Sequence, residues 1–173
     1  MLTASSPLQR LFDGIVRPGA VEWIGLRPAR HAPMQPMGEA LLREEDGVAG
    51  DHYCGRSGTR QVSLIGRESL DAIASFLGRE TAAPEQLRRN VVVRGVNLLA
   101  LKGRRFRLGD ALLEFAGECH PCSRMEQILG PGGYNAVRGQ GGILARVLRG
   151  GAVRTGDRLT AWNSTAPGDI EAP

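Results

Sequence analysis

Short runs of alternating apolar and polar residues recur along most of this chain. Alternation with a period of two predicts half-buried strands, because successive side chains of a strand point to opposite faces. From this pattern and from β-branched runs we expect strands over residues 21–26, 40–43, 61–65, 91–93, 112–116 and 143–148. The proline-containing stretch 31–37 and the turn-rich stretch 44–58 are expected to be loops.

Helical spacing is confined to two segments. Apolar residues at positions 70, 73, 74 and 77 share one face of a helix predicted over residues 68–77, with Gly78 as its stop. A second, short helix is expected to begin at Pro84 and to end before residue 90. Gly109-Asp110 and Gly156-Asp157 each mark a turn between two extended segments. Many short strands with few helices predict a mainly β (α+β) fold, built as a closed or partly closed barrel.

Length and composition place this pattern in a single domain. A chain of 173 residues with 42% hydrophobic residues can bury a core without disulfides. We expect residues 1–19 to be an N-terminal lead-in, 20–162 the folded domain and 163–173 a mobile tail. The sequence shows neither an apolar run of the roughly 20 residues that a membrane span needs nor a secretory pattern at its start. Three cysteines, an odd number, favour reduced thiols. We therefore expect a soluble, cytoplasmic protein that has no membrane partner.

The basic residues are almost all arginine. Lys102 is the only lysine among 22 basic residues, and the net charge is +4. A GC-rich genome accounts for most of these positions, but individual arginines can bind a phosphate or carboxylate through two parallel hydrogen bonds. Because aromatic residues make up only 5% of the chain and the basic charge is scattered, we expect no nucleic-acid partner.

The candidate chemistry centres on the C-x-x-C pair Cys119 and Cys122. The pair follows a predicted strand and precedes a predicted helix, with Pro121 suited to the first helical turn. Cys122 would then lie at or near the helix N-terminus, where the dipole favours a thiolate, and His120 and Arg124 could add positive charge. A thiolate can ligate a soft metal or attack sulfur.

Four interpretations of the pair remain open from the residues alone. A structural zinc site would need Cys54 and His52 to join the pair, because no second ligand motif is present. A thioredoxin-like redox pair would need a βαβ context that the strand pattern does not provide. The remaining two are a single reactive cysteine, Cys122, and two small hydrophobic residues buried at a strand–helix junction.

Two further segments carry weaker signals. Arg88 and Asn90 precede the strand at 91–93 and could bind an oxygen-rich ligand, although an asparagine at such a junction is more often a turn residue. The glycine-rich stretches 130–133 and 139–142 could bring backbone N–H groups near a phosphate, but such stretches are more often turns, and the spacing of a Walker motif is absent.

The order of these motifs along the chain closely resembles the MOSC domain, named for the C-terminal part of molybdenum cofactor sulfurase. The resemblance runs from about residue 21 to residue 159. It is carried by the segments 47–52, 60–64, 88–95, 108–110 and 121–122, and by a closing Gly-Ala-Val-Arg-Thr-Gly-Asp-Arg-Leu over 151–159. It identifies residues 20–162 as a MOSC domain. Stand-alone bacterial members are similar to proteins that protect against hydroxylaminopurine and other N-hydroxylated bases.

The resemblance implies a β-barrel-like fold and a set of site residues. Cys122 matches the family cysteine that carries sulfur or ligates molybdenum, and Arg27, His52, Arg88 and Asn90 match positions that would hold a molybdenum-bound pterin. His52 stands where members often have arginine, and arginine stands at position 89 where proline is common.

Two functions follow from the resemblance. The first is a molybdenum-cofactor oxidoreductase that reduces a small N-hydroxylated substrate, with Cys122 as metal ligand and a separate electron-donor protein. The alternative is a sulfur carrier that holds a persulfide on Cys122, received from a cysteine desulfurase, for metal–sulfur or cofactor assembly. The resemblance also implies a family that is linked to pyridoxal phosphate. A binding or regulatory module that has lost its chemistry is a third possibility.

Overall fold

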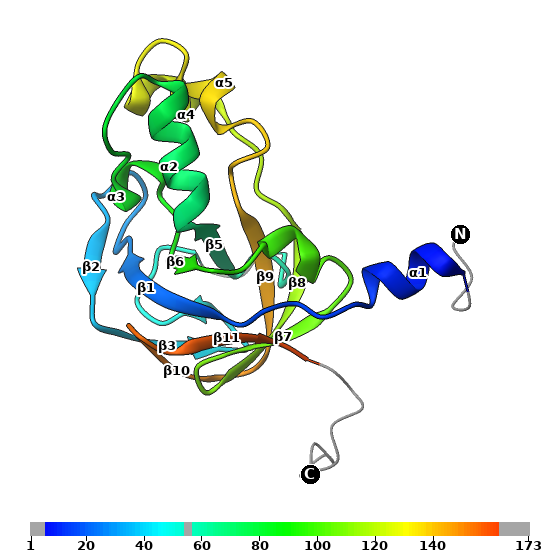
Figure 1. The fold of residues 1–173 in the computed structure, drawn as a ribbon. Helices are drawn as coiled ribbons and strands as arrows, with labels where there is room; N and C mark the ends of the chain where they lie inside the picture. The colour runs from blue at the N-terminus through cyan, green and yellow to red at the C-terminus, as the bar shows by residue number, and fades with distance from the viewer. Residues whose placement is uncertain (1–5, 54–56, 163–173) are drawn as a thin grey trace.

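The computed structural model describes residues 6–53 and 57–162 (Figure 1). Most of the described chain is β-strand. The strands are β1 (Gly19–Leu26), β2 (Gln35–Met37), β3 (Glu39–Arg43), β4 (Gly47–Val48), β5 (Val62–Gly66), β6 (Val91–Arg94), β7 (Arg105–Leu108), β8 (Ala111–Glu118), β9 (Ile143–Arg149), β10 (Gly151–Arg154) and β11 (Arg158–Ala161).

The helices are short. They are α1 (Pro7–Phe12), α2 (Arg67–Phe76), α3 (Pro84–Leu87), α4 (Ser123–Leu129) and α5 (Gly133–Val137), with one 3₁₀ turn, η1 (Leu98–Leu101). Helices α2 to α5 gather at one end of the strands, whereas α1 lies apart from them (Figure 1). No helix within residues 6–53 and 57–162 is long and apolar enough to cross a membrane.

The main sheet closes into a barrel. Its strand order is β11-β7-β8-β9-β5-β6-β1-β2, and β11 also pairs with β1 through Gly19 and Leu159, so β2 is left outside the closed ring. All neighbours are antiparallel except β5 and β6, which run parallel. Strands β10, β3 and β4 form a second, three-stranded sheet. The mainly β, α+β barrel expected from the sequence is confirmed.

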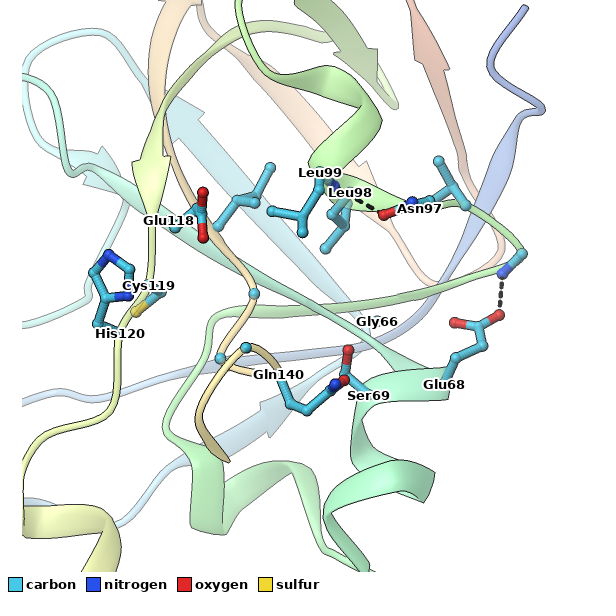
Figure 2. Close-up of a pocket in the computed structure, with 16 residues that line it drawn as sticks. Gly66, Glu68, Ser69, Asn97, Leu98, Leu99, Glu118, Cys119, His120 and Gln140 are labelled. Carbon is cyan, nitrogen blue, oxygen red and sulfur yellow. Dashed lines mark hydrogen bonds between the residues drawn. The ribbon is translucent and has the colours of Figure 1, made fainter. Parts of the chain in front are cut away.

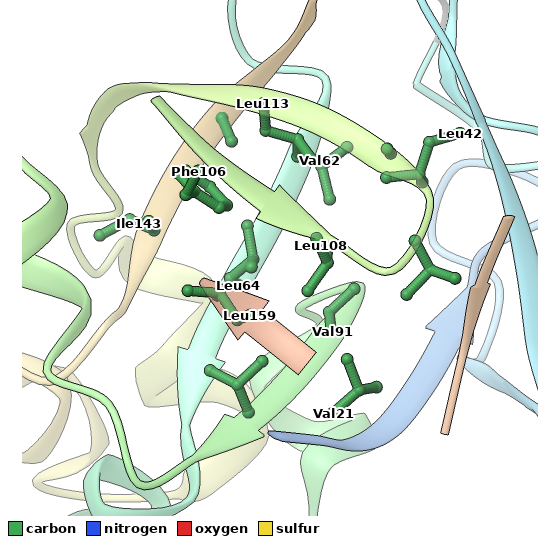
Figure 3. Packing of buried hydrophobic residues seen from close by; sticks show 14 of the residues in the cluster. Val21, Leu42, Val62, Leu64, Val91, Phe106, Leu108, Leu113, Ile143 and Leu159 are labelled. Atoms are coloured by element: carbon green, nitrogen blue, oxygen red, sulfur yellow. The ribbon is translucent and has the colours of Figure 1, made fainter. Parts of the chain in front are cut away.

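Two apolar clusters share the strands β5 and β6. Val62 and Leu64 of β5 and Val91 and Val93 of β6 point into the barrel, while Ile65 and Val92 pack under the helices. Because both faces of this parallel pair are covered, the two strands are apolar at nearly every position. Figure 3 shows the cluster inside the barrel, where the buried Phe106 has the largest side chain.

The predicted strands and helices, including the helix expected after Cys122, are present with boundaries shifted by a few residues. Helix α2 buries Leu70, Ile73 and Ala74, as its spacing predicts. The stretch 31–37 is not entirely loop, because Gln35–Met37 pairs with β1; Pro36 fits there because β2 is an edge strand and needs fewer backbone donors. Likewise, β4 forms within the stretch 44–58.

Helices α1 and α5 were not expected. Helix α1 lies in the predicted lead-in, begins after the cap Ser6, and none of its residues is buried. Helix α5 lies within the glycine-rich segment. The tail predicted over 163–173 lies outside the described residues.

Candidate functional site

The predicted site residues come from four connections around one end of the barrel. Arg27 directly follows β1, His52 follows β4, residues 88–90 link α3 to β6, and Cys122 precedes α4. Strand pairing brings the first and third of these together, because Ile24 of β1 pairs with Val91, the residue after Asn90. Parallel pairing of β5 with β6 adds Ser63 to the same region.

Asp51 organises the first part of the site. Its side chain is 1% exposed, and one of its carboxylate oxygens accepts a hydrogen bond from the backbone N–H of Arg27 at 2.6 Å. The other oxygen pairs with the Arg27 guanidinium at 3.2 Å and accepts from the N–H of Tyr53 at 3.2 Å. The backbone N–H of His52 donates to the carbonyl of Arg27 at 2.5 Å. These contacts fix Arg27 and the 51–53 turn against each other.

Asn90 is buried, with 2% exposure, and all of its side-chain atoms bond to protein. Its Oδ1 accepts from the backbone N–H and the hydroxyl of Ser63 at 3.1 and 2.9 Å. Its Nδ2 donates to the carbonyl of Gly25 and to Asp51, both at 3.3 Å. Asn90 therefore connects β5, β1 and the turn at Asp51. Because its side chain is fully bonded to protein, it would act on a bound ligand by positioning other residues and not by direct contact.

Arg88 presents its side chain from a strained backbone position. It ends α3 in the left-handed conformation, with φ 57° and ψ 34°, where glycine is the usual residue. Its Nη1 donates to the carbonyl of Ala32 at 3.0 Å. Partial burial lowers the pKa of Arg88, the charges of Arg27 and Arg124 act in the same direction, and Asp51 opposes them.

A histidine joins this group of cations. His31 has a left-handed backbone, with φ 66°, and its Nδ1 lies within hydrogen-bond distance of Nη1 of Arg124 on α4. The charge of Arg124 is the main reason why the pKa of His31 is lowered, and desolvation, Arg30, Arg88 and His52 add to it. The exposed His52 is therefore an electrostatic neighbour of His31. A lowered pKa favours the neutral imidazole, whose unprotonated Nδ1 can accept from the guanidinium.

Cys122 is an exposed free thiol at the N-cap of α4. Its carbonyl accepts from the N–H of Met125 at 2.9 Å, but its side chain makes no capping hydrogen bond. The predicted position at the helix N-terminus is confirmed. The placement of Pro121 inside the first turn is wrong, because Cys122 is extended and the helix begins only at Ser123. Cys119 is also a free thiol and is half-buried.

The buried Arg89 lies beside both cysteines. Its Nε donates to the carbonyl of Gly141 at 2.8 Å and its Nη1 to the carbonyl of Leu87 at 2.7 Å. Burial lowers the pKa of Arg89, while Cys119 and Cys122 act in the opposite direction, so both thiols are within electrostatic range of its guanidinium.

The glycine-rich segment 139–142 packs tightly against this part of the site. A Cβ added to Gly141 would lie 1.8 Å from the carbonyl oxygen of Cys119, and one added to Gly142 would lie 2.0 Å from that of Leu64. The backbone N–H of Cys119 also donates to the carbonyl of Gly142 at 2.8 Å. Because no side chain fits at either glycine, these two residues have a packing role that the sequence pattern did not distinguish from an ordinary turn.

A group of three arginines in this region could bind an anion. Arg27, Arg88 and Arg124 are electrostatic neighbours, and Asp51 is the carboxylate that opposes them at Arg88. The Nε atoms of Arg27 and Arg124 are buried without a hydrogen-bond partner in the described chain. Within that same part of the chain, no group of three or more His, Cys, Asp or Glu could hold a metal ion. Cys54, which the zinc interpretation requires, lies outside the described residues.

Sequence reasoning missed Asp51, Ser63 and Arg89 as parts of the site. Asp51 belongs to a segment that carries the resemblance, but only its hydrogen bonds in the structure show that it connects Arg27 with Asn90. Arg89 was noted only as a departure from a common proline. Its contact with Gly141 joins residues 52 positions apart, which no local pattern signals.

Comparison with known proteins agrees with this fold. The family model of the MOSC domain matches residues 34–160. No curated protein matches the chain. The match to the MOSC domain does not support the expected link to pyridoxal phosphate.

Solved bacterial structures share the architecture. The YuaD protein of Bacillus subtilis is 23% identical, with a TM-score of 0.73 over 86% of this chain and 100% of its own. YiiM of Geobacillus stearothermophilus is 16% identical, with a TM-score of 0.66 over 84% of this chain and 75% of its own. YiiM of Escherichia coli is 20% identical, with a TM-score of 0.62 over 88% and 72%. At these identities the structures establish the fold alone.

Proposed function

Because this chain belongs to the MOSC domain family, we propose that it binds the molybdenum cofactor through Cys122 and reduces N-hydroxylated bases or related N–O compounds. The MOSC domain is associated with binding of this cofactor in the family. The observation that carries the proposal is the exposed thiol of Cys122 at the N-cap of α4, the helix that also carries Arg124, whose Nε lacks a hydrogen-bond partner as that of Arg27 does.

The donor set fits a pterin that carries a phosphate. Arg27, Arg88 and Arg124 offer guanidinium groups, which match a phosphate with two parallel hydrogen bonds. The unpartnered Nε atoms of Arg27 and Arg124 indicate that their own protein contacts do not satisfy these groups. A thiolate is a soft ligand suited to a heavy transition metal. The residues present therefore fit the cofactor.

Each residue then has a distinct task. Cys122 would supply the protein ligand to molybdenum, and Arg27, Arg88 and Arg124 would hold the phosphate. Asp51 and Asn90 act as positioning residues, because they fix the backbone and side chain of Arg27. His52 supports the same turn through its backbone bond to Arg27. When bound, the cofactor supplies the redox chemistry, and the protein fixes its place and electrostatic environment.

Electrons for this reduction would come from a separate donor protein, because the sequence contains no flavin, haem or iron–sulfur motif. The second candidate function is the sulfur carrier, for which Cys122 receives a persulfide from a cysteine desulfurase. The exposure of Cys122 favours this alternative, since a carrier thiol must reach both its donor and its acceptor.

Elemental and pterin analysis tests the proposal directly. Wild type, Cys122→Ala and the matched control Cys119→Ala are expressed in a host that makes molybdenum cofactor. We expect near-stoichiometric molybdenum and pterin in the wild type and in Cys119→Ala, and loss of molybdenum in Cys122→Ala. Reduction of an N-hydroxylated base by the loaded protein with an artificial electron donor should follow the same order.

Absence of molybdenum from all three proteins would refute the cofactor function. Mass spectrometry then distinguishes the alternatives, because a persulfide adds the mass of one sulfur atom to Cys122 and supports the carrier. A protein with neither molybdenum nor persulfide would be a binding or regulatory module.

A further inference from the structure

A surface pocket of about 420 Å³ lies at the start of β1 and β11 and the end of β6. Its walls are residues 18–20, Glu68, Arg94, Gly95 and Arg158. Glu68 and Gly95 also line a larger cavity of about 550 Å³, which Figure 2 shows. The smaller pocket contains none of the residues that the proposed cofactor site uses.

Strand register places Arg94 and Arg158 on either side of Ala20. Ala20 of β1 pairs with Arg94 of β6 on one side and with Arg158 of β11 on the other. Directly paired residues point to the same face of a sheet. The next residue along each strand lies in the core inside the barrel, namely Val21, Val93 or Leu159. Because side chains alternate along a strand, Ala20 and both arginines point outward.

The small side chain of Ala20 leaves room between the two arginines. Neighbouring strands lie about 4.8 Å apart, so the backbones that carry Arg94 and Arg158 are separated by roughly 10 Å. Each guanidinium presents several N–H donors in a fixed fork that matches a carboxylate. A carboxylate that lies over Ala20 can therefore accept hydrogen bonds from both side chains.

The protein itself does not pair these two cations. The side chains of Arg94 and Arg158 make no hydrogen bond or ion pair with any other described residue. Elsewhere on the outer face of the strands, Glu114 lies 3.4 Å from Arg146 and 4.0 Å from Arg105. The two arginines of the pocket thus keep their donors available to a ligand.

Glu68 adds a negative charge to the same pocket. It lies in the first turn of α2, and its Oε1 accepts from the backbone N–H of Gly95 at 2.7 Å (Figure 2). Among the described residues, its Oε2 has no hydrogen-bond partner, and neither arginine of the pocket forms an ion pair with it. Glu68 would repel a simple anion, whereas a molecule with both a carboxylate and an ammonium group complements all three charges.

We propose that this pocket binds a free amino acid, with its carboxylate between Arg94 and Arg158 and its ammonium group donating to Glu68. All of these contacts are charge-assisted hydrogen bonds, which are stronger than neutral ones. The volume of about 420 Å³ is within the range of small-molecule sites. The site goes beyond the proposed redox function, because it needs neither Cys122 nor the cofactor.

NMR titration of isotope-labelled protein tests the proposal, in a buffer without phosphate or sulfate. The probes are L-alanine, N-acetyl-L-alanine, which lacks the ammonium group, and L-alaninamide, which lacks the carboxylate. We expect L-alanine to shift the backbone amide signals of Gly19, Ala20 and Gly95. It should bind about tenfold more tightly than either derivative, because each derivative loses charge-assisted contacts.

Two variants separate the roles of the charges. Glu68→Gln keeps an acceptor oxygen for Gly95 but removes the negative charge, so affinity for L-alanine should fall about tenfold while affinity for N-acetyl-L-alanine does not fall. Arg158→Gln should weaken binding of both probes about tenfold. The matched control is Arg149→Gln on β9, because Arg149 is exposed, makes no ion pair with a described residue and does not line the pocket. It should bind L-alanine like the wild type.

Unchanged amide signals at Gly19, Ala20 and Gly95 in the wild type would overturn the proposal. Equally tight binding of L-alanine and N-acetyl-L-alanine would also overturn it, as would wild-type affinity for L-alanine in a folded Glu68→Gln. None of these outcomes involves molybdenum, so failure of this proposal is distinguishable from failure of the cofactor function.

Discussion

At the residue scale, Arg88 has a left-handed backbone conformation, which is unfavourable for any residue that carries a side chain. A left-handed backbone costs a non-glycine residue about 1–2 kcal/mol, and the end of a helix is a place where glycine usually accepts it. Arg88 has φ 57° there, and its guanidinium lies close to Arg27 and Arg124. Strained positions of this kind cluster at binding sites. A requirement for the guanidinium of Arg88 in anion binding would explain why arginine, and not glycine, occupies this strained position.

Replacing Arg88 by glycine should separate stability from binding. In Arg88→Gly, relief of strain offsets loss of the bond to the carbonyl of Ala32, so we expect the free energy of unfolding to change by less than about 1 kcal/mol. The dissociation constant for inorganic phosphate should rise about tenfold, because one charge-assisted donor is lost. Chemical denaturation and calorimetric titration measure the two quantities.

The matched control is Arg17→Gly, which removes the same charge from an exposed position outside the site. It should leave phosphate affinity unchanged. If both variants bind phosphate equally well, Arg88 is not a phosphate ligand.

The sequence indicated which side chains belong to the candidate site, but not which contacts connect them. Arg27, Arg88, Asn90 and Cys122 belong to local motifs, so their positions along the chain were predictable. Asp51 contacts Arg27 and Asn90 across 24 and 39 positions, and those contacts depend on how β1 and β6 pair. For the same reason, the sequence could not show that the side chain of Asn90 is already fully bonded to protein.

At the element scale, one carboxylate connects α4, which follows Cys122, to α5. Glu126 accepts from the backbone N–H of Gly132 at 2.9 Å and of Tyr134 at 2.8 Å. These two bonds lower the pKa of Glu126, with Tyr134 as the larger cause and a smaller opposing effect of burial. A carboxylate can accept both bonds, one on each oxygen.

Glu126→Gln should loosen the connection between α4 and α5, because an amide has only one acceptor oxygen. We expect faster amide hydrogen exchange at Gly132 or Tyr134, measured by NMR at pH 7. In the wild type, the lowered pKa means that this stabilisation is present above the ordinary value of 4.5 and is lost as the pH falls through the lower, folded-state value. The acid-induced change should therefore begin below pH 4.5 and be absent from Glu126→Gln.

A matched control is Glu80→Gln, at an exposed residue without a hydrogen bond or ion pair among the described residues. Its amide exchange near residues 130–134 should match the wild type. Equal exchange in Glu126→Gln and the wild type would show that the two bonds do not hold this connection.

The spacing of apolar residues predicted the elements in which that spacing is regular, and it missed the elements in which it is not. Helix α2 has a regular apolar face and was located within a residue at each end. Helix α5 has only five residues in a glycine-rich segment, and it exists because its buried residues pack against α2 and α4. Strand β2 is likewise exposed throughout and is defined by its pairing with β1.

At the scale of the whole molecule, closure of the barrel supports the site. Strands β1, β5, β6 and β8 each lead to or from a site connection, and all of them contribute side chains to the core inside the barrel. A barrel removes the unpaired edges that an open sheet would expose, so its strands are held on both sides. The sequence indicated a barrel from the number of short strands, but the pairing of β11 with β1 that closes it could not be inferred locally.

Phe106 should be among the residues on which the whole fold depends. Its side chain is fully buried inside the barrel, so Phe106→Ala should lower the free energy of unfolding by about 3–5 kcal/mol, through lost apolar burial and the cavity left behind. The exposed Phe76 on α2 is the matched control, and Phe76→Ala should cost less than about 1 kcal/mol. Urea denaturation measures both. Because the strands of a closed barrel unfold together, Phe106→Ala should also lower the temperature at which the protein stops binding inorganic phosphate. Similar decreases in the free energy of unfolding of the two variants would contradict a core centred inside the barrel.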